Sequence, residues 1–516
     1  MSYPEIPETV VMDPDDPIRP KPPGRSPTRE AVGQILIAAS VALALGATLK
    51  QKAMISANDI SRWCTVWALL ERGTYAIDEC PWQLGTQDKV LLTEPFPTEG
   101  EEPSKKFYSS KPPLLPTLIA GALYPARALT GVPLDAKVEQ QRSRRKEVQS
   151  LSDTPPEDPS KILSEDPERG YRVVDVTPDE PAEWPVQVLY FNPVVVLLNV
   201  VPLLVALVLY ARLLDRYAGN DWAWFLSMAA AGLGTNLVIF TTTLNNHTVA
   251  AWSAFFALYA FLRIWDDGER HWGYFAVAGF FGAFCACNEL PSALFGVLLF
   301  LLLAVKVPGK TLSAFVPAAL VPVAAHFVTT YLAIGEWAPV YAAFSEEGPD
   351  SPYRYPGSYW LSPLGMDWYD LNPEPWWQYL LNLLVGHHGI FSLTPVFLFS
   401  FAAMVRSVLG LDRRLRTLSG LTLVLSAAIV AFYTWQTHNY GGSTQGARWL
   451  FWLFPFWLIL LPMGLEGGQD RPWLRRLTLA ALAFAVFNTG YGLQQPWSHP
   501  WIVDAIEHLG VLDVKR

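Results

Sequence analysis

From about residue 31 onward the chain alternates long apolar runs with short polar connections. Many of these runs approach or exceed the roughly 20 residues that a helix needs to cross a bilayer. Trp222–Leu262 carries no formal charge and has room for two spans that meet at Asn245-Asn246-His247. About eleven transmembrane helices are predicted, at residues 31–49, 187–211, 222–241, 248–264, 273–289, 291–305, 312–334, 388–405, 417–435, 449–465 and 477–494.

The segment Pro112–Thr130 is apolar but short, and it contains Pro116, Pro125 and Arg127. We place it on the outer surface as a juxtamembrane helix, because a span at this point would reverse the side of every later connection. With this choice the basic residues gather in loops on one side, which the positive-inside rule identifies as the cytoplasm. They are Arg212, Arg216, Arg263, Arg270, Lys306, Lys310, Arg406, Arg413, Arg414, Arg416, Arg471, Arg475 and Arg476.

The polar segments divide the chain into regions. Residues 1–30 are rich in Pro, Asp and Arg and are predicted to form a disordered cytoplasmic tail. Residues 31–334 form a transmembrane core with an outer loop at 51–186, and the polar insertion 131–186 within that loop is predicted to be one short helix and flexible chain. Residues 335–386 form an aromatic-rich outer loop whose rings suit sugar stacking or a headgroup-level belt. Residues 387–516 supply the last spans and a short outer tail.

The predicted fold is therefore an all-α integral membrane protein with an extracytoplasmic cap of juxtamembrane helices and loops. Hydrophobic residues make up 51% and charged residues 16% of the 516 positions, with a net charge of -9 and no basic patch that would bind nucleic acid. The lipid bilayer is the expected partner. Four cysteines are too few for a disulfide scaffold, although Cys64 and Cys80 share an outer loop where a disulfide can persist.

Nearly all of the unusual polar clusters fall on the outer side in this topology, so one extracytoplasmic site can collect them; His326 is the nearest exception. They are Asn58-Asp59, Lys105-Lys106, Lys111, Asn245-Asn246-His247, Asn288-Glu289, His387-His388, His438-Asn439 and Arg448.

The order of elements resembles a known family. A first span is followed by an outer loop with an acidic residue, then by Lys111-Pro112-Pro113-Leu114 at the start of a surface helix, then by a span that ends in Tyr210-Ala211-Arg212-Leu213-Leu214. This layout, over residues 30–265, is similar to that of the GT-C superfamily of polyprenyl-phosphate-sugar-dependent glycosyltransferases, in particular the aminoarabinose transferases and protein O-mannosyltransferases. The family's Asp-Glu pair is here Asn58-Asp59.

The resemblance implies roles for individual residues. Asp59 would be the catalytic base, because inverting transfer needs a group that takes the proton of the acceptor. Lys111 and Arg448 would hold the phosphate of the donor. Glu289 is a second candidate for a catalytic carboxylate. The remaining substrate-binding candidates are Asn58, Arg62, Lys105, Asn246, His247 and His388.

Each of these residues also has a structural interpretation. Asp59 would cap a helix that begins at Ile60, Lys111 would pair with ordinary lipid headgroups, and Arg448 would be an interfacial anchor. No cofactor is required by the predicted reaction. Glu289, His387, His388 and His438 are the only candidates that we consider for a divalent metal, and their spacing matches no zinc signature.

The sequence thus predicts a glycosyltransferase of the inner (plasma) membrane, which moves a sugar from a polyprenyl-phosphate carrier to an extracytoplasmic acceptor. A polytopic transporter or flippase for a lipid-linked glycan is the alternative, since the same basic residues would bind phosphate without chemistry. A catalytically inactive GT-C relative that acts as a scaffold is a third possibility.

Overall fold

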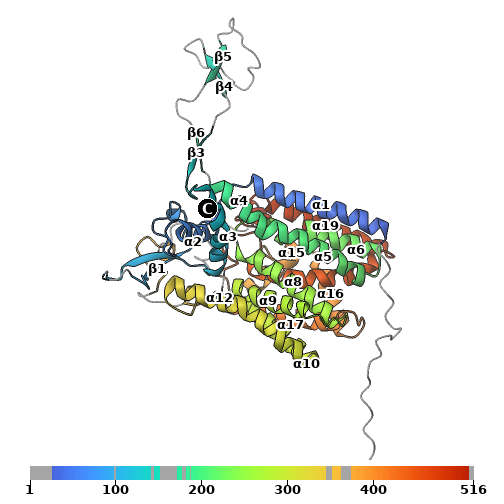
Figure 1. Cartoon of the computed structure of the whole chain (residues 1–516). Coiled ribbons are helices and arrows are strands. Elements are labelled where there is room, and N and C mark those ends of the chain that lie inside the picture. Colours follow the sequence, from blue (N-terminus) through green and yellow to red (C-terminus); the bar gives the residue numbers. More distant parts are fainter. Residues whose placement is uncertain are drawn as a thin grey trace, which may run out of the picture.

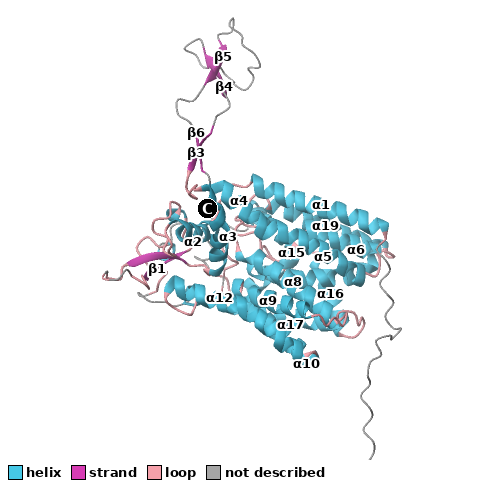
Figure 2. Cartoon of the chain, in the orientation of Figure 1, coloured by secondary structure: helices cyan, strands magenta, loops and turns pink. Residues whose placement is uncertain are grey.

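A bundle of long apolar helices makes up most of the protein, and a smaller cap of helices and strands covers one end of it (Figures 1 and 2). The computed structural model describes residues 26–97, 100, 102–140, 145–150, 171–176, 182–185, 187–343, 351–361, 373–437 and 439–510.

The helices of the bundle are α1 (Pro27–Lys50), α4 (Gln187–Val195), α5 (Val201–Tyr217), α6 (Asp221–Leu233), α7 (Asn236–Ile239), α8 (Asn246–Trp265), α9 (Trp272–Asn288), α10 (Ala293–Lys306), α11 (Pro308–Lys310), α12 (Val316–Ile334), α14 (Trp376–Leu384), α15 (Ile390–Leu393), α16 (Phe397–Val408), α17 (Arg416–Gln436), α18 (Phe454–Leu465), α19 (Pro472–Gly492) and α20 (Trp501–His508). The cap contains α2 (Ala57–Glu71), α3 (Leu114–Thr130), β1 (Lys89–Thr93) and β2 (Lys105–Ser109).

The prediction of eleven spans is wrong in number. Among the described residues, seven helical stretches are long and apolar enough to cross a membrane: Pro27–Lys50, Leu189–Tyr217, Asp221–Thr242, Asn246–Trp265, Pro308–Ile334, Arg416–Gln436 and Arg448–Gly468. Three more of the predicted spans form apolar helices of only 10 to 17 residues, namely Trp272–Asn288, Leu290–Lys306 and Phe397–Val408. The seven long apolar stretches fit a helical membrane protein.

Local residues explain why the other predicted spans fall short. The predicted span 388–405 is interrupted at Thr394-Pro395, where α15 ends. The longer helix in this segment is therefore α16. The last predicted span, 477–494, is the long helix α19, but polar residues at both of its ends, Arg475-Arg476 and Asn488-Thr489, limit its apolar stretch. The helix α3 is not among the seven, which agrees with its prediction as a juxtamembrane helix.

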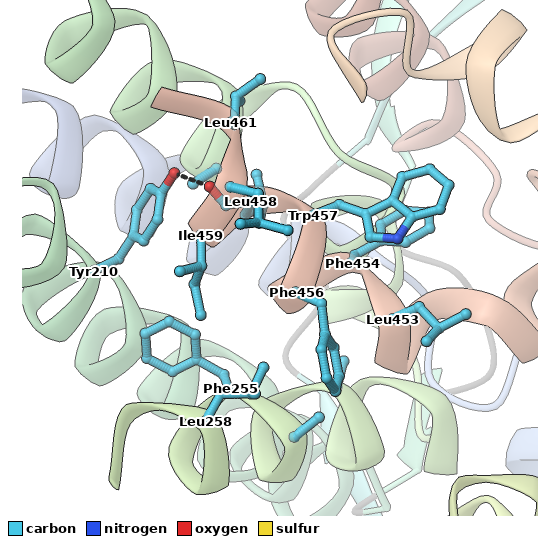
Figure 3. Packing of buried hydrophobic residues seen from close by; sticks show 14 of the residues in the cluster. Tyr210, Phe255, Leu258, Leu453, Phe454, Phe456, Trp457, Leu458, Ile459 and Leu461 are labelled. Atoms are coloured by element: carbon cyan, nitrogen blue, oxygen red, sulfur yellow. Dashed lines mark hydrogen bonds between the residues drawn. The ribbon is translucent and has the colours of Figure 1, made fainter. Parts of the chain in front are cut away.

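The core of the bundle forms where α18 lies between α5 and α8. Figure 3 shows its apolar side chains packed against Phe255 and Leu258 of α8. The hydroxyl of Tyr210 on α5 donates a hydrogen bond of 2.6 Å to the carbonyl of Leu458, which satisfies a polar group inside this apolar layer. The stretch Arg448–Gly468 is therefore fixed from both sides.

The basic loops meet at the end of the bundle away from the cap. Asp267 contacts both Arg216 and Arg263, and Glu466 accepts hydrogen bonds from Arg414 and from the backbone N–H of Gly219. The N-terminal Arg29 pairs with Asp221 at the same end. Connections that lie far apart in the sequence thus converge, as the charge distribution predicts.

The described residues differ from two predictions for the polar segments. The first helix begins at Pro27, with Ser26 as its N-cap, so residues 27–30 of the predicted tail are helical; residues 1–25 lie outside the described part. In the insertion 131–186 the described residues form no helix but four strands, paired as β3 (Lys137–Gln140) with β6 (Ala182–Pro185) and β4 (Arg145–Ser150) with β5 (Tyr171–Val176). The valines at 173, 174 and 176 favour extended chain.

The cap is held together by a disulfide and by strand pairing. Cys64 on α2 is bonded to Cys80, a bridge that the sequence allowed but did not decide, whereas Cys285 and Cys287 form no disulfide and are buried. The strands β1 and β2 form an antiparallel pair, and Leu91 on β1 also donates a backbone hydrogen bond of 3.0 Å to Pro352. The described part of the aromatic-rich loop therefore joins the cap.

Single cysteines at two exposed positions, Arg413 and Ser443, test the orientation of the bundle. In a background without the four native cysteines, a membrane-impermeant maleimide added to intact cells should label Arg413→Cys only after permeabilisation, but Ser443→Cys at once. The two positions lie in connections on opposite sides of the predicted membrane. Labelling of Arg413→Cys from outside would reverse the predicted topology.

Candidate active site

Asp59 belongs to the first turn of α2 and is fully buried. Ser56 is the N-cap and Asp59 is the third helical residue of a capping box: the N–H of Asp59 bonds to Ser56 Oγ, and Asp59 Oδ2 accepts from the Ser56 N–H (3.2 Å) and Oγ (2.9 Å). Asp59 Oδ1 accepts a hydrogen bond of 2.7 Å from the N–H of Leu244, which lies just before α8. The helix therefore begins at Ala57, not at Ile60 as predicted, and both oxygens of Asp59 are engaged.

Burial raises the pKa of Asp59 to about 6. The hydrogen bonds from Ser56 and Leu244 and the positive charge of Arg62 act in the opposite direction and lower this pKa. The carboxylate is thus ionised at neutral pH. It ties the cap to the start of α8, two residues before Asn246.

Arg62 lies one turn further along α2 and is 1% exposed. Its Nη1 donates to Asn58 Oδ1 at 2.8 Å, and its Nη2 donates to Asn246 Oδ1 on α8. Burial lowers its pKa to about 10, while the charges of Asp88, Asp59 and Glu289 act in the opposite direction. Arg62 therefore stays charged and links the cap to the bundle.

Asn246 extends this chain of hydrogen bonds to Glu289, which lies in the connection after α9. The Nδ2 of Asn246 donates to Glu289 Oε1 at 2.8 Å and to the carbonyl of Asn288 at 2.6 Å. The Nδ1 of His247 also contacts Glu289 Oε1. Burial raises the pKa of Glu289 to about 8, although the charges of Arg448, Arg62 and Lys111 lower it. One network thus joins Asn58 to four other predicted site residues, which are Arg62, Asn246, His247 and Glu289.

Lys111 follows strand β2 and forms an ion pair with Asp88, 2.9 Å from Nζ to Oδ1. Both side chains are about one-fifth exposed, at 21% and 17%. Burial lowers the pKa of Lys111, Asp88 raises it, and the charges of Arg62 and Arg448 lower it. The three cations therefore lie close enough to repel one another.

Arg448 opens the six-residue turn η10 (Arg448–Leu453) and is 7% exposed. Its guanidinium lies over the ring of Trp497, 4.8 Å from the centroid. Among the described residues, its Nε and Nη1 have no hydrogen-bond partner. A buried guanidinium with unpaired N–H groups is costly, so this side chain points to an anion that would complete its bonding.

A shallow pocket lies beside Lys111; the empty space in and in front of it, open solvent included, is about 380 Å³. Ser110 and Lys111 of the cap line one wall, while Thr330 on α12 and Tyr341 line the other. The hydroxyl of Tyr341 is close enough to Glu289 for that carboxylate to affect its pKa, which burial raises. Of the charged cluster, Lys111 is the residue that lines this pocket.

Two predicted residues lie outside this cluster. Lys105 is exposed at the start of β2, opposite Thr93. His388 stacks on Tyr440, 4.4 Å between centroids, and contacts His387 in a separate buried network around Glu374. His438 lies outside the described residues. In the part of the chain that the structure describes, no group of three or more His, Cys, Asp or Glu side chains converges to hold a metal ion.

Asp88 belongs to the cluster but is absent from the sequence prediction. It is one of several acidic residues of the outer loop, and no local pattern distinguishes it. Only the pairing of β1 with β2 brings it next to Lys111.

No protein-family model matches this sequence, and no curated protein matches it either. The resemblance to the GT-C superfamily therefore continues to depend on the short motifs around Asp59, Lys111 and Arg212.

Asp59→Ala should lower the stability of the protein by about 2 kcal/mol, because it removes the capping box and leaves the buried N–H of Leu244 unpaired. The melting temperature of the detergent-solubilised protein measures this loss. Glu79→Ala is the matched control, since it removes an exposed carboxylate of the same outer loop that pairs with Arg72 at the surface. Equal melting temperatures for the two variants would show that Asp59 is not a structural cap.

Proposed function

We propose that this protein is a membrane glycosyltransferase, which moves a sugar from a polyprenyl-phosphate carrier to an acceptor on the outer face of the plasma membrane. The observation that carries the proposal is the convergence of the buried Arg62 and Arg448 with Lys111, whose side chain is 21% exposed. The unpaired Nε and Nη1 of Arg448 support an anion such as phosphate as the missing partner, because buried N–H groups of a charged guanidinium need acceptors.

The surroundings of the pocket favour a lipid carrier over a soluble donor. The wall formed by the last turn of α12 continues into exposed apolar side chains, among them Phe327, Val328 and Leu332. An apolar face of this kind suits contact with acyl or polyprenyl chains. The phosphate of such a carrier would reach Lys111 while its chain stays among lipids.

The carboxylate beside the cations supports transfer rather than binding alone. In an inverting displacement, a base takes the proton of the acceptor hydroxyl, the acceptor oxygen forms a bond to the anomeric carbon, and the bond from that carbon to the phosphate oxygen breaks. The electron pair leaves with the phosphate, whose increased charge the three cations would stabilise.

Glu289 is the better-supported base of the two predicted carboxylates. Both oxygens of Asp59 already accept hydrogen bonds from the cap and from Leu244, whereas the contacts of Glu289 with Asn246 and His247 are made by Oε1. The pKa of Glu289, about 8, is also close to the pH at which a general base is most effective. We therefore assign the base to Glu289 and a structural role to Asp59.

Lys111→Ala and Arg448→Ala should each weaken binding of farnesyl phosphate by about ten- to a hundredfold, because each removes a charge-assisted hydrogen bond worth roughly 1.5–3 kcal/mol. Lys111→Arg should recover part of the affinity. Lys105→Ala is the control, since Lys105 is exposed and outside the cluster. Titration of the detergent-solubilised proteins measures the affinities, and losses no larger than that of Lys105→Ala would refute the proposed phosphate site.

Glu289→Gln should slow sugar transfer from a radiolabelled polyprenyl-phosphate sugar by about 10²- to 10⁴-fold, with donor binding retained. Only the ionised carboxylate accepts a proton, so the wild-type rate should rise as the pH is raised through about 8, and this rise should be absent in Glu289→Gln.

Asp59→Asn is the companion variant and should transfer sugar at a nearly normal rate. A large loss in Asp59→Asn together with normal transfer by Glu289→Gln would return the base to Asp59. Donor binding by the wild-type protein without any turnover would favour a transporter or an inactive relative instead.

A further inference from the structure

The register of the outer hairpin places Asp88 beside Lys111. Lys89 on β1 pairs with Ser109 on β2, so the residues just outside this pair, Asp88 and Ser110, also face each other. The N–H of Ser110 donates 3.1 Å to the carbonyl of Asp88. Lys111 is the next residue, and its N–H bonds to Ser109 Oγ at 3.1 Å. Strand pairing thus sets the separation of the two charged side chains.

The helix α2 fixes the same corner of the hairpin. Ser61 Oγ donates a hydrogen bond of 2.6 Å to the carbonyl of Asp88, and it lies 2.6 Å from Ser109 Oγ. The N–H of Asp88 bonds to Thr86 Oγ1 at 3.0 Å. Both backbone groups of Asp88 are therefore engaged, and Ser61 is the neighbour of Arg62. The carboxylate is presented from a rigid position between α2 and Lys111.

Asp88 also offsets the repulsion among the cations. Arg62, Lys111 and Arg448 come from α2, from the chain after β2 and from η10; Arg62 and Arg448 are buried and the side chain of Lys111 is 21% exposed, so water screens their charges less than at the open surface. Of the carboxylates around Arg62, Asp88 raises the pKa of the guanidinium most, ahead of Asp59 and Glu289, and Asp88 also raises the pKa of Lys111. Without it, three like charges would share a site with weaker compensation.

We infer that Asp88 is a positioning residue of the phosphate site, whose carboxylate holds the ammonium of Lys111 in the pocket. The inference builds on the proposed function, which supplies the phosphate that Lys111 would bind. It assigns Asp88 no contact with the reacting atoms. The competing interpretation is that Asp88 occupies the place of the phosphate and opposes its binding.

Two measurements on Asp88→Asn separate these interpretations. The first is competitive labelling of Lys111 with acetic anhydride in the ligand-free protein, read by mass spectrometry across a pH series. The pKa of Lys111 should fall when Asp88 is neutral, because burial and the charges of Arg62 and Arg448 then act alone. The onset of labelling should move to lower pH. Glu94→Gln is the control, since Glu94 pairs with Lys106 in the same hairpin at 2.7 Å.

The second measurement is the affinity for farnesyl phosphate at pH 7. A positioning role predicts that Asp88→Asn binds it about tenfold more weakly, the size of one charge-assisted hydrogen bond, and that Glu94→Gln binds normally. Tighter or unchanged binding by Asp88→Asn would overturn the inference, as would unchanged labelling of Lys111. If Asp88→Asn does not fold, Asp88→Glu should restore the labelling profile of the wild-type protein, and failure to do so would overturn the inference as well.

The two proposals fail in distinguishable ways. If the wild-type protein does not bind farnesyl phosphate, the proposed function is wrong, while the labelling of Lys111 still reports whether Asp88 controls its charge.

Discussion

The burial of Arg62 is the constraint on which the candidate site depends. A guanidinium that is 1% exposed must have its N–H groups bonded, and here the acceptors are Asn58 in its own helix and Asn246 at the start of α8. One side chain thus fixes the cap relative to the bundle. Because Asn246 also donates to Glu289, the position of that carboxylate follows from the same requirement.

The position of Arg448 depends on a different local constraint. The preceding loop contains Gly441, whose φ of 104° is a backbone conformation that residues other than glycine rarely adopt. A Cβ at this glycine would lie 2.6 Å from Nε of Arg448, so the backbone passes directly over the guanidinium. With Trp497 on its ring face, the side chain has few alternatives. The glycine-rich loop therefore restricts the position of Arg448.

Sequence reasoning identified the features that depend on long patterns. Apolar runs predicted a helical membrane protein, the distribution of arginines predicted which loops gather at one end, and the outer loop of Cys64 and Cys80 allowed their bridge. The number of spans was wrong because hydropathy alone does not reveal interruptions such as Thr394-Pro395. The pairing of Asp88 with Lys111 was missed because it arises from strand register between distant residues, and nothing in the sequence around Asp88 encodes it.

The same limit explains the change in the roles of the carboxylates. A sequence motif places Asp59 in the right loop, but only the structure reveals that Ser56 and Leu244 engage both of its oxygens. The first residue of the Asp-Glu pair in the family that this chain resembles corresponds here to Asn58. The side chain of Asn58 accepts a hydrogen bond from Arg62. An aspartate at residue 58 would pair with Arg62 as an ion, whereas the amide leaves the charge of Arg62 available to other anions.

This arrangement suits a reaction that moves charge without changing its total. In the proposed transfer, Glu289 begins ionised and ends protonated, while the phosphate gains one negative charge as the bond to the sugar breaks. The sum over the buried site therefore stays constant, and Arg62, Lys111 and Arg448 are present near both the initial and the final location of the charge. Because fixed cations in a poorly screened site need no reorganisation during the step, a cluster assembled in advance by Asn246, Asp88 and Gly441 is the form in which they would be most effective.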